Sequence, residues 1–360
     1  MQDKYIDLET LKQEMLTCTM CGFCKQVCPV FLDVGWDTGS PRGRMTMAYG
    51  LITGEFEPDE TFRERIFQCT QCTDCYRRCP SSAKCPDVVL AARRELVRRG
   101  FINPAQTKLV ENVCNTGNIF ADLDVEFPEQ NGEIPLFIGC QHLSRPNNTK
   151  KTIKLLQALK IYPKIIREVC CGFPLAIMGF EKEHQEQKSR LESIFPMNGD
   201  PMITFCPSCL MHLKKEYGQP VQHVLQIINN KLDDAPLDMI GKTVTYHDPC
   251  DLSRGAGVID EPREILRKIG CDLREMTHVK KESRCCGGGG GILTWDESLS
   301  DRMGMARIAE AVNTGAEMIV TSCPTCEQTL KKSARNYAEK NSTKPLPVRH
   351  ILDLVIKAIK

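Results

Sequence analysis

The sequence lacks the features that would place a protein in a membrane, outside the cell or on nucleic acid. No stretch of about 18 uncharged apolar residues occurs, so no membrane-spanning helix is predicted. The N-terminus has no apolar core behind a basic start, as a secretory signal requires. The 47 basic residues are balanced by 46 acidic ones, which argues against a nucleic-acid partner. We therefore expect a cytoplasmic protein that would reach a membrane only through another subunit.

Cysteine, by contrast, is abundant, with 21 residues in a chain of 360. Disulfides do not persist in a reducing cytoplasm, so a count this high indicates metal or cluster ligation, with redox thiols as the alternative. An apolar content of 41% is enough for two or three domains with cores of their own. The positions of the cysteines then indicate which of them act together.

Eight cysteines form two runs of the pattern C-x2-C-x2-C-x3-C-P, the ligand spacing of bacterial ferredoxins that hold two cubane [4Fe-4S] clusters. The first run contains Cys18, Cys21, Cys24 and Cys28, and the second contains Cys69, Cys72, Cys75 and Cys79. In this pattern three thiolates bind one cluster and the fourth reaches the other. We thus expect Cys28 at the second-run cluster and Cys79 at the first-run cluster. Zinc is the alternative, but four-cysteine zinc sites usually separate two C-x2-C pairs by a longer loop.

The residues around the two runs predict a helical ferredoxin domain, which we place at residues 1–125. Apolar residues recur at helical intervals between the runs, in segment 30–68. Residues 87–99 form another predicted helix, stopped by Gly100. The arginines of this helix are interpreted as a solvated face, with a docking patch for an acidic partner as the alternative. They are Arg93, Arg94, Arg98 and Arg99.

Beyond residue 130 the sequence repeats itself. Each copy has an apolar run ending in one cysteine, then two adjacent cysteines followed by glycine, then a C-P-x-C pair. The first copy contains Cys140, Cys170, Cys171, Cys206 and Cys209, and the second contains Cys250, Cys285, Cys286, Cys323 and Cys326. Such a repeat indicates two copies of one fold unit, which we place at residues 132–235 and 241–360. Because β-rich runs alternate with helical stretches, each copy is predicted to be a small α/β domain with a parallel sheet, so the chain as a whole belongs to an α + α/β class.

Adjacent cysteines need a tight bend to bring their thiols together, because neighbouring side chains of a strand point to opposite faces. Gly172 and Gly287 follow the two pairs and are free to adopt positive φ. In the second copy glycine continues to residue 291. Gly287, Gly288 and Gly289 are predicted to let backbone N–H groups approach a cofactor or a substrate thiolate. Phosphate binding is the alternative, but the run lacks the GK[ST] ending of a P-loop.

These motifs together resemble the D subunit of archaeal heterodisulfide reductase and the iron–sulfur subunits of glycolate and lactate oxidase complexes. The resemblance covers nearly the whole chain. It implies that a set of five cysteines binds a noncubane [4Fe-4S] cluster, beside the two cubane clusters. The first copy departs from the second, because Phe173 and Pro174 follow its single glycine. The resemblance therefore implies one or two noncubane clusters, and the content of the first copy is the open point.

The resemblance also implies two-electron reduction of a small-molecule disulfide, with each noncubane cluster taking one sulfur and supplying one electron. His247, three residues before Cys250, is the candidate catalytic proton donor because histidine titrates in a suitable range, with Asp248 as a possible orienting group. A hydrogen bond within its own loop is the alternative role of His247. His142 occupies a roughly comparable place in the first copy.

A second function is compatible with the same motifs, namely an electron-transfer subunit that serves a flavoprotein oxidising a hydroxyacid such as lactate or glycolate. No G-x-G-x-x-G fingerprint follows a predicted strand, so a flavin would belong to a partner. For disulfide reduction the expected partner is a b-type cytochrome subunit. The second ferredoxin run and the helix after it favour the heterodisulfide reductase type. The remaining cysteines, Cys85, Cys114 and Cys271, are interpreted as packing thiols, and Cys85 is the one most open to revision.

Overall fold

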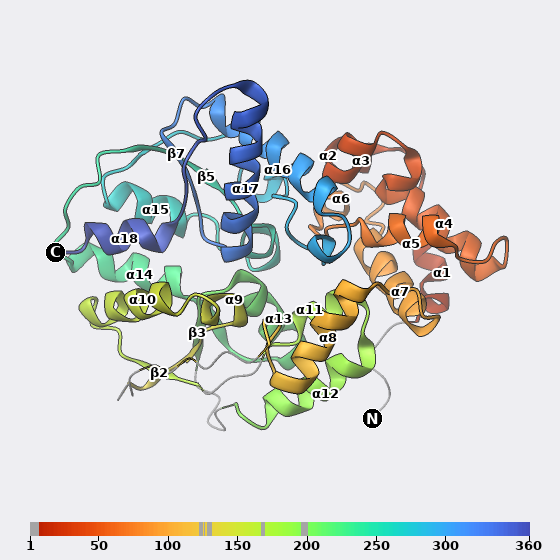
Figure 1. Cartoon of the computed structure of the whole chain (residues 1–360), viewed down its shortest axis with the longest axis horizontal. Coiled ribbons are helices and arrows are strands. Elements are labelled where there is room, and N and C mark those ends of the chain that lie inside the picture. Colours follow the sequence, from red (N-terminus) through yellow and green to blue (C-terminus); the bar gives the residue numbers. More distant parts are fainter. Residues whose placement is uncertain (1–6, 122–124, 126, 128–131, 167–169, 196–200) are drawn as a thin grey trace.

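The structure, a computed structural model, describes residues 7–121, 125, 127, 132–166, 170–195 and 201–360. A helical N-terminal part is followed by two α/β parts, each with a four-stranded sheet (Figure 1). The predicted α + α/β class is confirmed. The predicted boundary between residues 125 and 132 lies largely outside the described residues. No helix of the described part is both long and apolar enough to cross a membrane.

The N-terminal part is built from helices joined by short loops. They are η1 (Glu9–Leu11), α1 (Lys12–Leu16), α2 (Phe23–Val27), α3 (Pro29–Val34), η2 (Asp37–Gly39), α4 (Pro41–Thr53), α5 (Glu60–Phe67), α6 (Asp74–Arg77), α7 (Cys85–Arg98) and α8 (Pro104–Thr116). Side-chain caps fix several starts: Ser40 accepts from Gly43 N, and Asp59 accepts from Phe62 N. Apolar residues of α4, α5 and α7 form one buried cluster. Because this core joins the helices on both sides of the second cysteine run, it holds that run in place.

The first α/β part contains β1 (Ile134–Phe137), α9 (Cys140–Leu143), α10 (Pro146–Ala158), β2 (Pro163–Ile165), α11 (Phe173–Met178), α12 (Glu181–Glu192), β3 (Met202–Thr204), α13 (Pro207–Tyr217), β4 (Val221–His223), α14 (Val224–Lys231) and η3 (Leu232–Asp234). The second contains β5 (Thr243–His247), the π-helical turn η4 (Asp251–Gly255), α15 (Glu261–Lys268), β6 (Asp272–Leu273), η5 (Lys280–Glu282), η6 (Ile292–Thr294), α16 (Glu297–Val312), β7 (Met318–Thr321), α17 (Pro324–Asn341), β8 (Val348–His350) and α18 (Ile351–Ala358). The two parts thus repeat one order of elements.

Both sheets are parallel and have equivalent strand orders, β2-β1-β3-β4 and β6-β5-β7-β8. In each sheet the strand order reverses between the two central strands. Loops that follow the central strands meet at this switch point, where open α/β sheets gather their binding residues. Cys140 and Cys206 follow β1 and β3, and Cys250 and Cys323 follow β5 and β7. The fold therefore brings the single cysteine and the C-P-x-C pair of each copy together.

The two α/β parts share one hydrophobic core. Leu136 and Ile203 from the first sheet belong to the same buried cluster as Tyr246 and Val320 from the second. Helix α10 contacts α18, and α14 contacts α15 (Figure 1). Burying this much apolar surface between two sheets fixes their relative position, because apolar burial is the main favourable term in folding. The ends of the strands that carry the cysteines are therefore held in a constant arrangement.

The repeated segment PVQH in the first copy and PVRH in the second has a structural purpose in both. His223 accepts a hydrogen bond at Nδ1 from Leu225 N, and His350 accepts one from Leu352 N, each at 3.4 Å. These histidines therefore cap the helices α14 and α18. The repeat in the sequence is thus explained by helix capping.

Arg93 of α7 joins all three parts of the chain, and its interpretation as a solvated side chain is wrong. Its exposed fraction is 0%. Nη1 donates to the carbonyl oxygens of Ile177 at 2.6 Å and Gly290 at 2.8 Å, and Nη2 donates to that of Cys69 at 2.5 Å. These carbonyls lie in the first α/β part, the second α/β part and the second ferredoxin run. Arg98 at the end of the helix and Arg99 after it are exposed as predicted, and Arg94 is partly buried.

Replacing Arg93 with methionine should destabilise the assembly of the three parts. The apolar stem would remain, but the carbonyl oxygens of Ile177, Gly290 and Cys69 would lose this donor, and an unsatisfied buried group costs about 1–3 kcal/mol. We expect a total loss of about 3 kcal/mol or more. Anaerobic urea unfolding of the iron-loaded chain, followed by circular dichroism, measures this.

The matched control for this variant is Arg98→Met on the same helix. Its ion pairs with Asp7 and Glu95 lie at the surface, and its pair with Glu181 of the first α/β part is long, at 3.9 Å. Such pairs contribute little, so the change should stay within about 0.5 kcal/mol. Equal stabilities of the two variants would show that Arg93 does not hold the parts together.

Candidate metal centres

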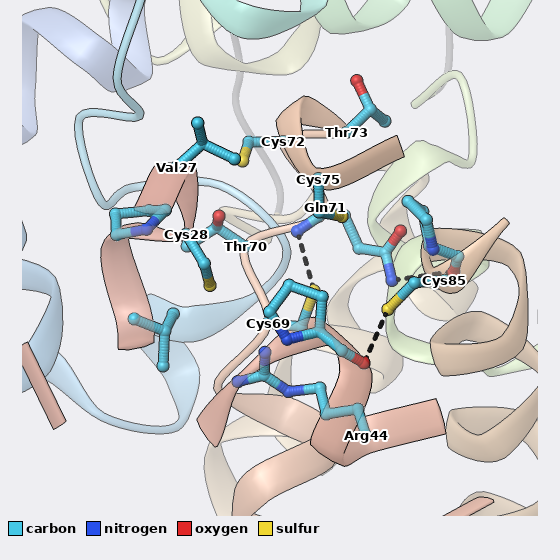
Figure 2. A pocket seen from close by; sticks show the side chains of 14 residues that line it. Val27, Cys28, Arg44, Cys69, Thr70, Gln71, Cys72, Thr73, Cys75 and Cys85 are labelled. Atoms are coloured by element: carbon cyan, nitrogen blue, oxygen red, sulfur yellow. Dashed lines mark hydrogen bonds between the residues drawn. The ribbon is translucent and has the colours of Figure 1, made fainter. Parts of the chain in front are cut away.

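The second ferredoxin run lines a small cavity together with a cysteine from the first run. Cys69 and Cys72 come from the loop between α5 and α6, Cys75 lies in α6, and Cys28 precedes α3 (Figure 2). These are the four thiols that the spacing assigned to one cluster. Burial raises the pKa of Cys28 to about 12, so its thiolate needs a cation or a metal to form. The geometry brings the four thiols together, and their ligation of iron stays a prediction.

Two further side chains at this cavity were not found from the sequence. Cys85, interpreted as a packing thiol, lines the cavity and is in hydrogen-bonding contact with Cys75. Its Sγ also donates to the Pro41 carbonyl oxygen at 3.2 Å (Figure 2). Arg44 lines the same cavity and is 1% exposed. It is therefore a buried cation beside the predicted thiolate ligands, where its charge would offset theirs.

The cysteines of the first run lie closer to solvent. Cys21 is exposed, whereas Cys18, Cys24 and Cys79 are partly buried. Cys18 and Cys79 pack against the same apolar cluster. Burial and the neighbouring thiols raise the pKa of Cys24 to about 11. The first-run site is thus the more accessible of the two sites in the N-terminal part.

The second ferredoxin run touches the second α/β part directly. The thiols of Cys72 and Cys285 are in hydrogen-bonding contact, and this contact together with burial raises the pKa of Cys72. Arg254 of η4 donates from Nε to the Cys72 carbonyl oxygen at 2.7 Å, and from Nη1 to that of Ser283 at 2.6 Å. The predicted ligands of a cubane cluster and of the second five-cysteine set are therefore neighbours.

Each five-cysteine set is assembled in the structure, and contacts between its thiols run in the same order in both copies. The series is Cys140, Cys170, Cys171, Cys209, Cys206 in the first copy and Cys250, Cys285, Cys286, Cys326, Cys323 in the second. Sγ of Cys171 lies 3.6 Å from that of Cys209, and Sγ of Cys286 lies 3.3 Å from that of Cys326. Gly172 and Gly287 have φ of +86° and +89°, the conformation predicted for the bend after each pair.

The thiol sets fit an iron–sulfur cofactor. Nine of the ten cysteines are buried and Cys250 is partly buried. Thiolates this close repel one another in a buried site unless a cation stabilises their charges. Soft sulfur donors in such an arrangement favour iron–sulfur clusters over metal ions that prefer oxygen ligands. The donor chemistry does not distinguish a cubane from a noncubane cluster.

A cavity of about 190 Å³ lies between the two sets. Four cysteines of each set line it: Cys140, Cys171, Cys206 and Cys209 from the first copy, and Cys250, Cys286, Cys323 and Cys326 from the second. Phe173, Pro174, Ile177 and Met178 of α11 provide an apolar wall. The residues after the first copy's single glycine, which set it apart from the second, thus form part of the cavity.

The glycine run of the second copy also meets the cavity, but the structure gives it a packing role as well. Gly288 and Gly289 line the cavity, whereas Gly287 does not. A Cβ on Gly290 would lie 2.6 Å from the Cys69 carbonyl oxygen, and one on Gly289 would lie 3.2 Å from that of Thr70. Glycine is therefore required because the ferredoxin loop approaches this backbone closely. Binding of a cofactor by Gly287, Gly288 and Gly289 stays a prediction.

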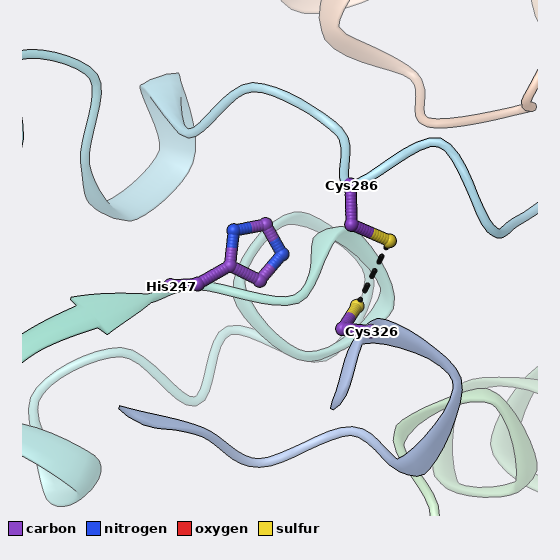
Figure 3. Close-up of side chains that lie close together, drawn as sticks. All are labelled: His247, Cys286 and Cys326. Atoms are coloured by element: carbon purple, nitrogen blue, oxygen red, sulfur yellow. Dashed lines mark hydrogen bonds between the residues drawn. The ribbon is translucent and has the colours of Figure 1, made fainter. Parts of the chain in front are cut away.

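His247 lies beside the second set and outside the cavity lining (Figure 3). It is 1% exposed, and burial together with Arg307 lowers its pKa to about 3. Nε of Arg307 donates to His247 Nδ1 at 3.1 Å. The partner of His247 Nδ1 is therefore Arg307 and not Asp248. The Asp248 carboxylate accepts from Arg263 at 2.8 and 2.9 Å. A catalytic proton transfer by His247 stays a prediction.

Asp251 is a cavity residue that sequence reasoning missed. It directly follows Cys250, and its carboxylate accepts from Ser208 Oγ at 2.5 Å. Ser208 belongs to the first copy, so this hydrogen bond joins the two cavity walls. Burial raises the pKa of Asp251. His142, the weaker candidate in the first copy, is buried against the rings of Phe205 and His350 and does not line the cavity.

Comparison with known protein families agrees with this division of the chain. Residues 14–83 match a 4Fe-4S dicluster domain, and residues 134–214 and 244–331 match the cysteine-rich CCG domain. Together these matches cover well over half of the chain. The chain therefore belongs to the iron–sulfur proteins that join a dicluster ferredoxin domain to two CCG domains.

Individual relatives narrow the class. An uncharacterized iron–sulfur protein of Methanocaldococcus jannaschii is 27% identical over 96% of this chain and 74% of its own length. The D subunit of the dihydromethanophenazine:CoB–CoM heterodisulfide reductase of Methanosarcina barkeri is 28% identical over 96% of this chain and 94% of its own length. The chain is thus similar over nearly its whole length to an iron–sulfur subunit of heterodisulfide reductase.

A solved structure shows the same fold in a distant protein. A hypothetical protein from Helicobacter pylori superposes with a TM-score of 0.60 over 89% of this chain and 67% of its own, at 8% identity. At this identity the likeness concerns the fold alone.

The position of Cys28 predicts which cluster its loss will damage. Cys28→Ala should disturb the cluster of Cys69, Cys72 and Cys75, because the structure places Cys28 in their cavity. Electron paramagnetic resonance (EPR) and Mössbauer spectra of the reduced variant measure this. Cys21→Ala and Cys72→Ala supply the reference spectra for damage to the first-run and second-run clusters. A Cys28→Ala spectrum that matches Cys21→Ala would contradict the crossed arrangement.

Proposed function

We propose that this chain reduces a small disulfide in the cavity between its two CCG domains, with electrons that enter through its ferredoxin runs. The observation that carries the proposal is the cavity lining, to which each five-cysteine set contributes four thiols. A carrier of single electrons has no need for two such sets to face one space. A disulfide, by contrast, has two sulfur atoms that must each accept an electron and a proton as the S–S bond breaks.

Noncubane [4Fe-4S] clusters bound at the two sets would supply one electron to each sulfur. The residues of the chain perform the remaining tasks. Phe173, Ile177 and Met178 form an apolar wall that excludes water and contacts the apolar parts of a substrate. The hydrogen bond between Ser208 and Asp251 holds the two walls at a fixed separation. Both sulfurs of a bound disulfide are thereby presented to opposite sides of the cavity.

The electron route follows from the contact between the second ferredoxin run and the second CCG domain. Cys72 touches Cys285, and Arg254 binds the Cys72 carbonyl oxygen. Electrons would thus pass from the accessible first run to the second run and then to the second five-cysteine set. The first run, where Cys21 is exposed, is the place for a redox partner to dock.

The partner would be another subunit of a redox complex. The expected electron donor is a b-type cytochrome subunit or a flavoprotein, and contact with a membrane would go through that subunit. The competing function is a carrier for a flavin-dependent hydroxyacid dehydrogenase. The two functions can be distinguished by experiment, because a carrier requires no substrate in the cavity.

The ligand assignment as a whole predicts about 16 iron atoms per chain, four for each of four clusters. Metal analysis of the anaerobically reconstituted chain measures the iron and zinc content together. About 12 iron atoms would reduce the assignment to three clusters. Zinc in place of most of the iron would refute it.

Filling the cavity should separate disulfide reduction from electron transfer. Leu109 of α8 lines the cavity, and Leu109→Trp adds bulk there without replacing a cysteine. We expect the rate of reduction of the CoB–CoM heterodisulfide, with reduced viologen as donor, to fall roughly tenfold to hundredfold. Iron content and reduction of the cubane clusters should be unchanged, because the ferredoxin runs lie outside the substituted wall.

The control is Lys108→Trp, at the exposed neighbouring position of the same helix. It should keep the wild-type rate. If Leu109→Trp also kept the wild-type rate with full iron content, the cavity would not be the substrate site. A Gly289→Val variant is less informative here, because its side chain would also press on the Thr70 backbone.

A further inference from the structure

We propose that His247 donates a hydrogen bond from Nε2 to the sulfur atoms of the second five-cysteine set, and that Arg307 holds the ring in the form that donates. The proposal rests on the proposed function in one respect, namely that this set holds a cluster. It assigns to His247 a tuning role in place of proton transfer. Its consequence is that the two CCG sites accept electrons at different potentials.

The hydrogen on the ring is placed by Arg307. A guanidinium only donates hydrogen bonds, and Nε of Arg307 lies 3.1 Å from His247 Nδ1. Nδ1 must therefore be the acceptor and carry no hydrogen. In a neutral imidazole the hydrogen is then on the other nitrogen. His247 thus carries an Nε2–H group.

The Nε2–H group faces the cysteines. One ring nitrogen of His247 and the Sγ atoms of Cys286 and Cys326 all lie within 4.8 Å of one another. Figure 3 shows the ring pointing toward the two cysteines. Among the residues that the structure describes, Nε2 is buried and has no hydrogen-bond partner. An unsatisfied buried donor is unfavourable, and a thiolate or cluster sulfur at this place would accept its hydrogen bond. Direct ligation by Nε2 would require loss of its hydrogen.

Arg307 is itself fixed, so the ring has little freedom to turn. The guanidinium is 1% exposed. Nη1 donates to Glu310 at 2.7 Å, and Nη2 donates to Ser283 Oγ at 3.4 Å. A guanidinium does not release its proton near neutral pH. If His247 gave up its Nε2 proton, Arg307 therefore could not supply a new one through Nδ1. The geometry suits a permanent hydrogen bond better than a proton-transfer cycle.

The first copy has no histidine N–H donor at the corresponding position. Phe137 stands three residues before Cys140, as His247 stands three residues before Cys250. Phe137 is 0% exposed and packs in an apolar cluster with Cys171, Cys206 and Cys209. The same strand position thus places a polar N–H beside one set of thiols and a phenyl ring beside the other.

Hydrogen bonds to cluster sulfurs stabilise the more negative reduced state and so raise the reduction potential. We infer that the second CCG site is the easier of the two to reduce. This is also the site whose Cys285 touches Cys72. The first electron from the ferredoxin runs would therefore be held at the second site until another arrives.

The test uses the whole iron-loaded chain. With ¹⁵N-labelled histidine, pulsed EPR of the reduced second-site cluster should show a weakly coupled nitrogen and an exchangeable deuteron after transfer to D₂O. His247→Leu should abolish both signals and shift the midpoint potential of that cluster to a lower value at unchanged iron content. His247→Gln, which keeps an N–H donor, should recover part of the shift.

Arg307→Met provides a second variant that leaves the ring in place. Without its donor the ring can adopt either tautomer, so the potential should fall by less than in His247→Leu. Phe137→Leu is the matched control in the first copy and should leave the second-site potential unchanged. If His247→Leu fails to hold iron, the nitrogen and deuteron couplings of the wild type, compared with His247→Gln, decide the question.

Three results would overturn the proposal. A strongly coupled histidine nitrogen would show that His247 is a ligand of the cluster. Absence of both couplings would show that the hydrogen bond does not exist. An unchanged midpoint potential in an iron-replete His247→Leu variant would show that the hydrogen bond does not affect the potential of the second-site cluster. A wild-type chain with no cluster at the second set would instead refute the proposed function, so the two failures are distinguishable.

Discussion

A single buried cation, the guanidinium of Arg93, holds the redox-active loops of this protein against one another. It binds carbonyl oxygens of Cys69, Ile177 and Gly290, and thereby ties a ferredoxin loop to both walls of the cavity. Burial lowers its pKa to about 10, so it stays charged at neutral pH. The close approach that it enforces explains why the backbone beside the second cysteine pair has no side chains.

The two CCG domains are alike in their ligands and unlike in their surroundings. Both sets of five thiols are assembled in the same order, and both face one cavity. The first domain supplies the apolar wall that begins with Phe173, whereas the second supplies the contact from Cys285 to Cys72. The two copies of the fold thus share their thiol arrangement and differ in what packs around it.

The sequence allowed prediction of features that depend on local spacing, and not of features that depend on distant contacts. The ferredoxin runs, the two repeats and the positive φ of Gly172 and Gly287 follow from short motifs. The burial of Arg93 does not, because its partners lie 24 to 197 residues away, and other arginines of the same segment, Arg98 and Arg99, are exposed. Arg307 is 60 residues from His247, so its hydrogen bond to the imidazole ring could not be predicted from the sequence either.

The central claim is that a disulfide is cleaved between the two five-cysteine sets. The most direct measurement is a single-turnover reaction of the anaerobically reduced, iron-loaded chain with the CoB–CoM heterodisulfide, followed by thiol counting and freeze-quench EPR. The account predicts two thiols released for two electrons withdrawn, with the disulfide changing the signals of the CCG sites before those of the ferredoxin runs. Oxidation of the chain by a quinone with no thiol released from the disulfide would contradict it.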